Sequence, residues 1–176
     1  MKHFLLLLIS LAAAAAALAA PPLGQTLPSV TLEGKAGGLV AGGAWRSEAL
    51  KGKTILLFYI DPDEKTLNDE AIAEFAKQKR NDEKFQSVVV INMAATWLPN
   101  VAIQSSLEAK QKEFPQTQYA RDMSRVLVQA WNLGDDNNDV MLLDATGKVL
   151  FAKDGKLTPA ETQTVIRLIG EQGAGL

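Results

Sequence analysis

The sequence predicts an α/β fold in which helices flank a central mixed β-sheet, with an N-terminal hairpin as an extension. Three observations support this prediction. Residues 55–60 and 87–91 are apolar throughout, as in strands that helices cover on both faces. Residues 68–79 and 100–114 carry apolar side chains at helical spacing. Nearer the C-terminus, two short apolar runs surround a glycine-containing turn, which is typical of an antiparallel hairpin.

The first residues of the chain have the features of a targeting segment. Lys2, the uncharged apolar run 4–18 and the motif Ala17-Leu18-Ala19 predict a signal peptide over residues 1–19. An alanine-rich run of this length is short for a membrane span of roughly 20 residues, which favours cleavage over anchoring. We therefore expect residues 20–176 to be a single soluble domain in the periplasm, with no membrane attachment after cleavage.

Residues 21–43 are rich in glycine and proline and form the predicted N-terminal hairpin. The first central strand, 55–60, is expected to end at Asp61-Pro62-Asp63, because proline and aspartate interrupt strands. The helix 68–79 then follows, with Ala71, Ile72, Phe75 and Ala76 on its apolar face. This part of the chain is therefore a βα unit.

The second strand, 87–91, leads to a helix predicted to start at an Asn100 cap and to end before Pro115. The resulting β-α-β-α order favours parallel pairing with right-handed crossovers. A short strand at 119–123 and a short helix at 124–131 complete this part of the domain.

The hairpin predicted over residues 140–152 precedes the helix with the clearest local signals. Thr158 is expected to cap this helix, with Pro159 at its first position and Glu161 at its third. Gly170 is expected to end it.

Composition excludes several classes of function. The chain has no cysteine, and its single histidine, His3, lies in the predicted signal peptide. The domain therefore has neither a thiolate nor an imidazole for catalysis. A formal net charge of −2 without a run of Lys and Arg argues against nucleic acid as a partner. No catalytic, cofactor-binding or metal-ligating residue is assigned.

The order of elements and several short motifs resemble those of periplasmic thioredoxin-like proteins. These motifs are residues 24–28, 50–53, 143–149 and 157–159, in the expected order and spacing. More narrowly, the chain is similar to the YtfJ family of cysteine-free periplasmic proteins, through Ser105-Ser106-Leu107-Glu108, Ala130-Trp131-Asn132-Leu133 and residues 152–159. The resemblance implies a thioredoxin-like fold and an exported protein.

The same resemblance locates the positions that carry redox chemistry in thioredoxin-like oxidoreductases. The Cys-x-x-Cys motif corresponds to Asp63-Glu64-Lys65-Thr66, and the nearby cis-proline corresponds to Asn138. Thiol exchange, peroxide reduction and disulfide isomerisation all require a sulfur nucleophile. The chain is therefore not a thiol-disulfide oxidoreductase.

Carboxylates gather where the redox residues are missing, in two loops that the fold is expected to place face to face: Asp61, Asp63, Glu64, Asp135, Asp136 and Asp139. One interpretation is a surface that binds a cationic protein segment. A second is that the acids form turns and cap helices. A third is a divalent-cation site, although Val140 stands where a calcium loop of the EF-hand type needs glycine.

Aromatic residues offer an apolar anchor for such a surface. Trp97 follows the end of a predicted strand, where open α/β sheets usually bind ligands. Tyr59, in the first central strand, is the other candidate anchor. Trp131 lies at the end of an apolar helix and is expected in the core.

These observations favour a periplasmic thioredoxin-like protein without redox chemistry that acts as a binding or interaction module. The expected partner is a protein or peptide with cationic segments. The alternative is a carboxylate-based enzyme or a cation-dependent protein that uses Asp61, Asp63 and Asp139. This alternative requires that the three carboxylates converge around a pocket.

Overall fold

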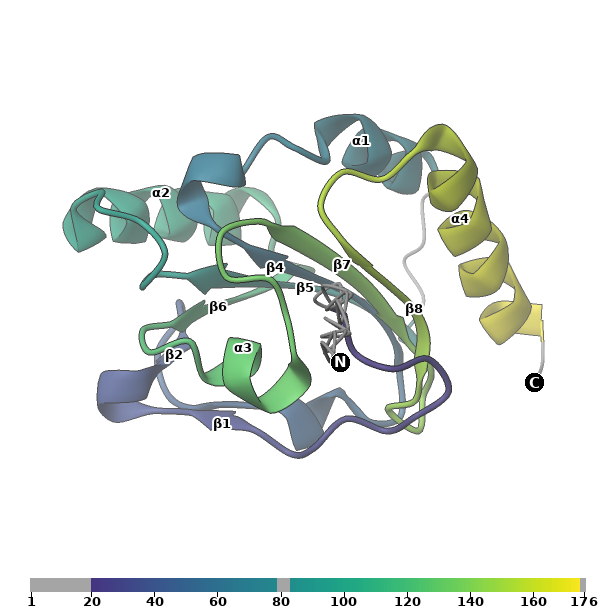
Figure 1. Cartoon of the computed structure of the whole chain (residues 1–176), viewed down its shortest axis with the longest axis horizontal. Coiled ribbons are helices and arrows are strands. Elements are labelled where there is room, and N and C mark those ends of the chain that lie inside the picture. The colour runs from purple at the N-terminus through teal and green to yellow at the C-terminus, as the bar shows by residue number, and fades with distance from the viewer. Residues whose placement is uncertain (1–19, 79–82, 175–176) are drawn as a thin grey trace, which may run out of the picture.

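The structure, a computed structural model, describes residues 20–78 and 83–174 (Figure 1). The signal peptide predicted over residues 1–19 lies outside these ranges. The strands are β1 (Thr31–Leu32), β2 (Gly37–Leu39), β3 (Trp45–Arg46), β4 (Thr54–Ile60), β5 (Phe85–Asn92), β6 (Gln118–Asp122), β7 (Asn138–Leu143) and β8 (Val149–Asp154). The main sheet has six strands in the order β2-β6-β5-β4-β7-β8. β5 is parallel to both β4 and β6, whereas the other pairs are antiparallel, so the predicted mixed sheet is confirmed.

Helices cover both faces of this sheet. The helices of the described ranges are η1 (Gly34–Ala36), η2 (Ser47–Leu50), η3 (Pro62–Glu64), α1 (Asp69–Lys77), α2 (Asn100–Glu113), α3 (Val126–Trp131) and α4 (Pro159–Ala174). Figure 1 shows α1, α2 and α4 on one side of the sheet, and α3 with β1 on the other. This layering explains why β4 is buried along its whole length, as the apolar sequence of its residues predicts.

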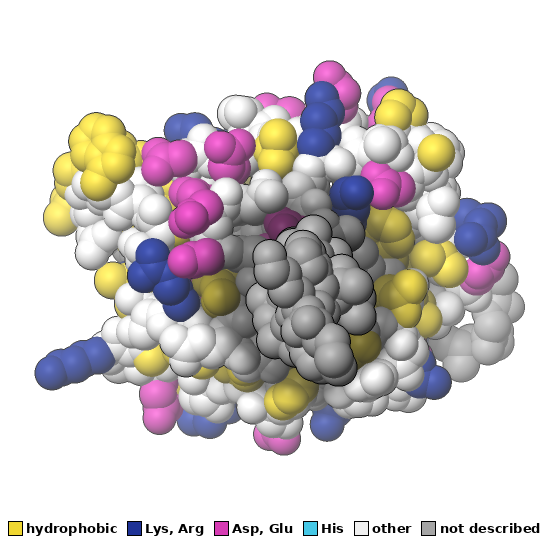
Figure 2. Space-filling view, viewed as in Figure 1, with side chains coloured by type: hydrophobic (Ala, Val, Ile, Leu, Met, Phe, Trp, Pro, Cys, Tyr) yellow, Lys and Arg dark blue, Asp and Glu magenta, His cyan; other side chains and the backbone are white. Residues whose placement is uncertain are grey.

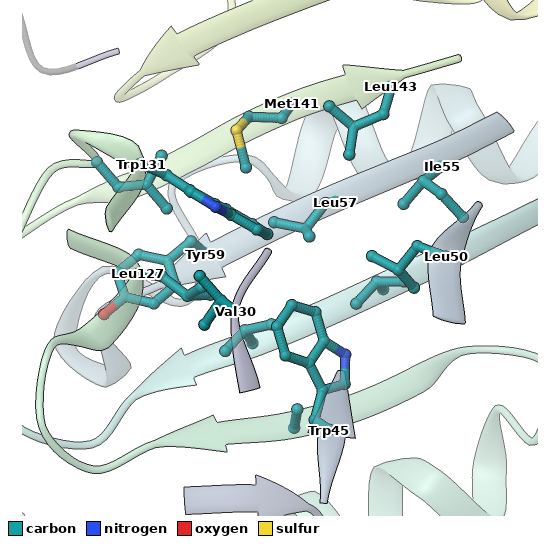
Figure 3. Packing of buried hydrophobic residues seen from close by; sticks show 14 of the residues in the cluster. Val30, Trp45, Leu50, Ile55, Leu57, Tyr59, Leu127, Trp131, Met141 and Leu143 are labelled. Carbon is teal, nitrogen blue, oxygen red and sulfur yellow. The ribbon is translucent and has the colours of Figure 1, made fainter. Parts of the chain in front are cut away.

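Alternate side chains of β4 enter two separate cores. Ile55, Leu57 and Tyr59 pack with Trp45 and Trp131 on the α3 side (Figure 3). The intervening residues of β4 pack against α1, α2 and α4 on the opposite side. The period of two along a strand therefore decides which helices each residue meets.

The N-terminal extension contributes more than the predicted hairpin. β1 and β3 pair antiparallel, with Thr31 opposite Arg46. β2, which lies between them in the sequence, joins the edge of the main sheet beside β6. The close approach of β2 to β6 requires glycine at position 37, where a Cβ atom would lie 1.9 Å from the carbonyl oxygen of Arg121.

Three local predictions about the helices are wrong. Pro99, with extended backbone angles, occupies the cap position of α2, so Asn100 is already the first helical residue. Ile72 of α1 is exposed rather than on a buried face. α4 continues past Gly170 to Ala174, because glycine ends a helix by adopting a left-handed conformation and Gly170 does not adopt one.

The predicted cap of α4 is confirmed. The backbone N–H of Glu161 donates to Thr158 Oγ1 at 3.2 Å, and the backbone N–H of Thr158 donates to Glu161 Oε2 at 2.8 Å. This second bond holds the pKa of Glu161 below its ordinary value.

We expect Thr158→Ala to lower the free energy of unfolding by about 1 kcal/mol, because one helix-end donor loses its partner. Urea unfolding followed by circular dichroism measures this change. Thr164→Ala, in the interior of the same helix, is the matched control and should cost nothing, since alanine favours helix. Equal losses in the two variants would show that the cap does not stabilise α4.

Candidate functional site

One end of the main sheet is unusually polar. β4, β5 and β6 end there and β7 begins there, so their terminal residues lie side by side. We call this region the polar edge. Its buried polar residues are Asp61, Asn92, Asp122, Asn138 and Asp139. Burying polar groups costs free energy unless they are hydrogen-bonded, so the bonds of each residue decide its role.

The two acidic loops meet at the polar edge. The backbone N–H of Asp61 donates to the carbonyl oxygen of Asn137 at 2.8 Å. Asn138 Nδ2 donates to the carbonyl oxygen of Glu64 at 3.3 Å. Asn138, which corresponds to the cis-proline of the oxidoreductases, is the first residue of β7, and no described peptide bond is cis.

The six predicted carboxylates divide into a surface group and a buried group. Asp63 and Asp136 are exposed, and Glu64 and Asp135 are half-buried. Figure 2 shows acidic side chains gathered over η3 and the loop between α3 and β7. Asp61 and Asp139 are buried, so the prediction that they belong to a docking face is wrong. They are buried because Asp61 directly follows β4 and Asp139 is the second residue of β7, and both strands are fully buried.

Asp61 forms a turn, in agreement with the second interpretation of the acidic loops. Its Oδ1 accepts from the backbone N–H of Asp63 at 2.9 Å, which caps η3. Burial raises the pKa of Asp61, and the negative charges of Asp63, Asp136 and Glu64 raise it further.

Asp135 is held by a cation and an amide. Arg125 Nε donates to its Oδ1 at 2.6 Å and to its Oδ2 at 2.8 Å. Asn92 Nδ2, at the end of β5, donates to the same Oδ1 at 3.0 Å. The contact with Arg125 is an ion pair that neutralises part of the acidic surface.

Asp122 is a buried organising residue that the sequence analysis missed. Its carboxylate accepts four hydrogen bonds: from Tyr59 Oη at 3.2 Å and from the backbone N–H groups of Ser124, Val126 and Leu127 at 3.1, 3.0 and 2.8 Å. It thus joins β4 to the start of α3. The signal that could have found it is an aspartate two residues before a predicted short helix.

Tyr59 cannot anchor a partner, so that prediction is wrong. Its side chain is fully buried, and Figure 3 shows its ring inside the core with the hydroxyl at the rim. Burial raises the pKa of Tyr59, and the neighbouring Asp122 carboxylate raises it further. Tyr59 points inward because it shares a face of β4 with Leu57 and Ile55.

Trp97 and Trp131 have opposite surroundings. Trp131 belongs to the core, as predicted, and its Nε1 donates to the carbonyl oxygen of Pro28 at 2.8 Å. Trp97 is 87% exposed and lies just before α2. Beside the start of α2 is an open groove of about 400 Å³, whose lining includes Met93, Val101 and Met123.

The structure does not bring Asp61, Asp63 and Asp139 together. Asp61 faces the backbone of Asp63, whereas Asp139 lies against Gly134 and Asp154. Among residues 20–78 and 83–174 no three acidic side chains are grouped so that they could hold a metal ion. The alternative that relied on the convergence of these three carboxylates therefore lacks its geometric basis.

The element order and the mixed sheet define a protein of thioredoxin-like fold, with carboxylates and amides gathered at its polar edge. The chain matches, over residues 24–172, the model of a family described as "Bacterial protein of unknown function (YtfJ_HI0045)". The chain belongs to this YtfJ family.

Two relatives support the assignment. The Uncharacterized protein YtfJ of Escherichia coli is 33% identical over 129 residues, which cover 71% of this chain and 70% of the relative. An uncharacterized protein of Haemophilus influenzae is 29% identical over 156 residues, which cover 84% of each chain.

Solved structures of redox enzymes share the fold. A thiol-disulfide isomerase from Corynebacterium glutamicum has a TM-score of 0.60 at 15% identity, over 87% of this chain and 98% of the isomerase. A thiol peroxidase from Chromobacterium violaceum has the same TM-score and identity, over 87% of this chain and 88% of the peroxidase. At this identity the likeness concerns the fold alone. Within its described part, this chain has no helix long and apolar enough to cross a membrane.

Proposed function

We propose that this chain is a periplasmic binding protein that docks a basic segment of a partner protein, without thiol chemistry. The docking surface is the acidic face, which we define as Asp63, Glu64, Asp135 and Asp136. The observation that carries the proposal is the concentration of uncompensated negative charge there. In the described part of the chain, the carboxylates of Asp63, Glu64 and Asp136 have no ion-pair partner.

The acidic face is held in place by hydrogen bonds between its two loops. The contacts between Asp61 and Asn137 and between Asn138 and Glu64 join its two loops. A preorganised surface loses little conformational freedom on binding, which favours affinity. Carboxylates on such a surface form strong, charge-assisted hydrogen bonds with lysine and arginine.

Trp97 is proposed as an apolar contact near the acidic face. An exposed tryptophan offers a large rigid surface, and tryptophan is enriched among the residues that dominate binding energies. Figure 2 shows hydrophobic side chains projecting from the same end of the molecule as the gathered acidic groups. A partner segment that combines basic and apolar residues fits both features.

We expect the variant Asp63→Asn, Glu64→Gln, Asp136→Asn to retain roughly ten-fold less partner protein than the unmodified chain. The measurement is affinity capture from periplasmic extract with residues 20–176 as bait. Asp135 stays unchanged because it holds Arg125. The control variant Glu33→Gln, Glu48→Gln, Glu171→Gln removes the same charge from exposed positions elsewhere and should capture like the unmodified chain.

Salt and Trp97 provide two further comparisons. Raising salt from about 0.1 M to about 1 M shortens the screening length from roughly 10 Å to roughly 3 Å and should release the captured partner. Trp97→Ala should reduce capture without changing the melting temperature. If capture is indifferent to salt and equal for the two triple variants, the acidic face is not the docking surface.

A further inference from the structure

Asp139 and Asp154 form a pair of carboxyl groups beneath the loop between α3 and β7. The two residues are opposite each other in the antiparallel register of β7 and β8. Both approach Gly134 of that loop. A Cβ atom at position 134 would lie 2.6 Å from Asp154 Oδ1 and 3.3 Å from Asp139 Oδ2. Glycine at this position therefore leaves space for the two carboxyl groups.

Each carboxyl group has one buried oxygen that is unsatisfied. Asp139 Oδ1 accepts from the backbone N–H of Gly134 at 3.2 Å, and the side chain of Asn137 acts on Asp154 so as to lower its pKa. Asp139 Oδ2 and Asp154 Oδ1 are both buried, and neither has a hydrogen-bond partner within the described ranges. Ionised carboxylates only accept hydrogen bonds, so two of them cannot satisfy each other.

We propose that Asp139 and Asp154 share one proton, and that the resulting O–H···O bond joins β7 to β8 beneath residues 134–137. A single proton converts one unsatisfied acceptor into a donor aimed at the other. It also removes one of two negative charges from a buried site, where like charges repel strongly. The loop above the pair, which donates the Gly134 N–H to Asp139, carries Asp135 and Asp136.

Among the residues that the structure describes, the pair forms no ion pair with a cationic side chain. Tyr59, opposite Asp139 on β4, is bonded to Asp122. Lys153, next to Asp154 on β8, is paired with Glu161 of α4 at 3.2 Å. Arg125, next to the loop, is paired with Asp135.

Acidity supports the same conclusion. Burial, and to a smaller extent the charge of Asp154, raise the pKa of Asp139 to about 7, although the hydrogen bond from Gly134 acts in the opposite direction. Burial also raises the pKa of Asp154. In the unfolded chain an aspartate has a pKa of about 3.9. The folded state thus binds the proton more tightly, and the stability it supplies is lost as pH rises from about 4 to about 7.

The chain offers a clear pH window for the test. The only histidine is His3, which lies outside residues 20–176. In this part of the chain, therefore, no side chain with an ordinary pKa titrates between about 5.5 and 8. We expect the melting temperature of residues 20–176 to fall by several degrees, on the order of 3–6 °C, across this window. Asp139→Asn supplies a permanent N–H donor and should flatten the profile, whereas Asp63→Asn, outside the pair, should retain it.

Two local measurements complete the test. The ¹³C chemical shift of the Asp139 carboxyl carbon in the unmodified chain should titrate near neutral pH, which requires no variant. Hydrogen exchange at the Gly134 amide, corrected for the intrinsic rate, should become faster above pH 7. The proposal is overturned by a carboxyl titration below pH 5, or by equal pH profiles for the unmodified chain and Asp139→Asn. It is also overturned if Ca²⁺ stabilises the unmodified chain at pH 8 but not Asp139→Asn, because the pair would then hold a cation.

Discussion

Replacing Trp131 with alanine is expected to lower the free energy of unfolding by about 3–5 kcal/mol. Trp131 is buried in the core on the α3 side, where its ring meets Trp45 edge-on with centroids 6.1 Å apart (Figure 3). The substitution leaves a cavity and also removes the bond from the indole N–H to the carbonyl oxygen of Pro28. The N-terminal extension would therefore lose one of its connections to the domain.

Urea unfolding followed by circular dichroism measures this loss, and Trp97→Ala is its matched control. The two substitutions delete the same side chain, but Trp97 is 87% exposed. Its loss should change stability by less than about 0.5 kcal/mol. Similar losses for the two variants would mean that Trp131 does not occupy a tightly packed core.

Asp122→Ala is expected to destabilise the fold by at least about 3 kcal/mol, because a hydrogen bond to a charged group contributes about 1.5–3 kcal/mol and Asp122 accepts four. The substitution leaves the Tyr59 hydroxyl and the first backbone N–H groups of α3 without an acceptor. These donors are buried or half-buried, so water replaces the carboxylate only in part.

Thermal and urea unfolding both report this effect. Asp136→Ala, an exposed acid in the next loop, removes the same charge and should be nearly neutral. Asp122→Asn keeps the shape but presents an amide donor to other donors, so it should recover only part of the loss. If Asp122→Ala unfolds like Asp136→Ala, the hydrogen bonds of Asp122 do not stabilise α3.

The predictions that depend on neighbouring residues in the sequence are largely confirmed. The uninterrupted apolar run in β4 predicts a strand buried on both faces, because no polar alternation marks a wet side. The spacing of Thr158 and Glu161 predicts the hydrogen bonds between them, since a capping box joins residues three positions apart. The absence of cysteine excludes thiol chemistry whatever the fold.

The errors at the candidate site concern residues whose partners are distant in the sequence. The sequence suggests Tyr59 as a surface anchor. In the structure, β4 and β6 both pair with β5, and this pairing brings Tyr59 to Asp122, which lies 63 positions later in the chain. The sequence places Asp139 in an acidic loop. In the structure it belongs to β7 and lies opposite Asp154 of β8.

By itself, therefore, the sequence determined the order of the main strands and helices and the absence of thiol chemistry, because those properties follow from local spacing and composition. Only the tertiary structure decided which carboxylates are surface charges and which are buried hydrogen-bonding groups. Burial and strand register are set by packing between distant segments, and a shift of one residue in a strand exchanges its two faces. Asp63 and Asp136 consequently remain in solvent, whereas Asp61, Asp122 and Asp139 became part of the interior.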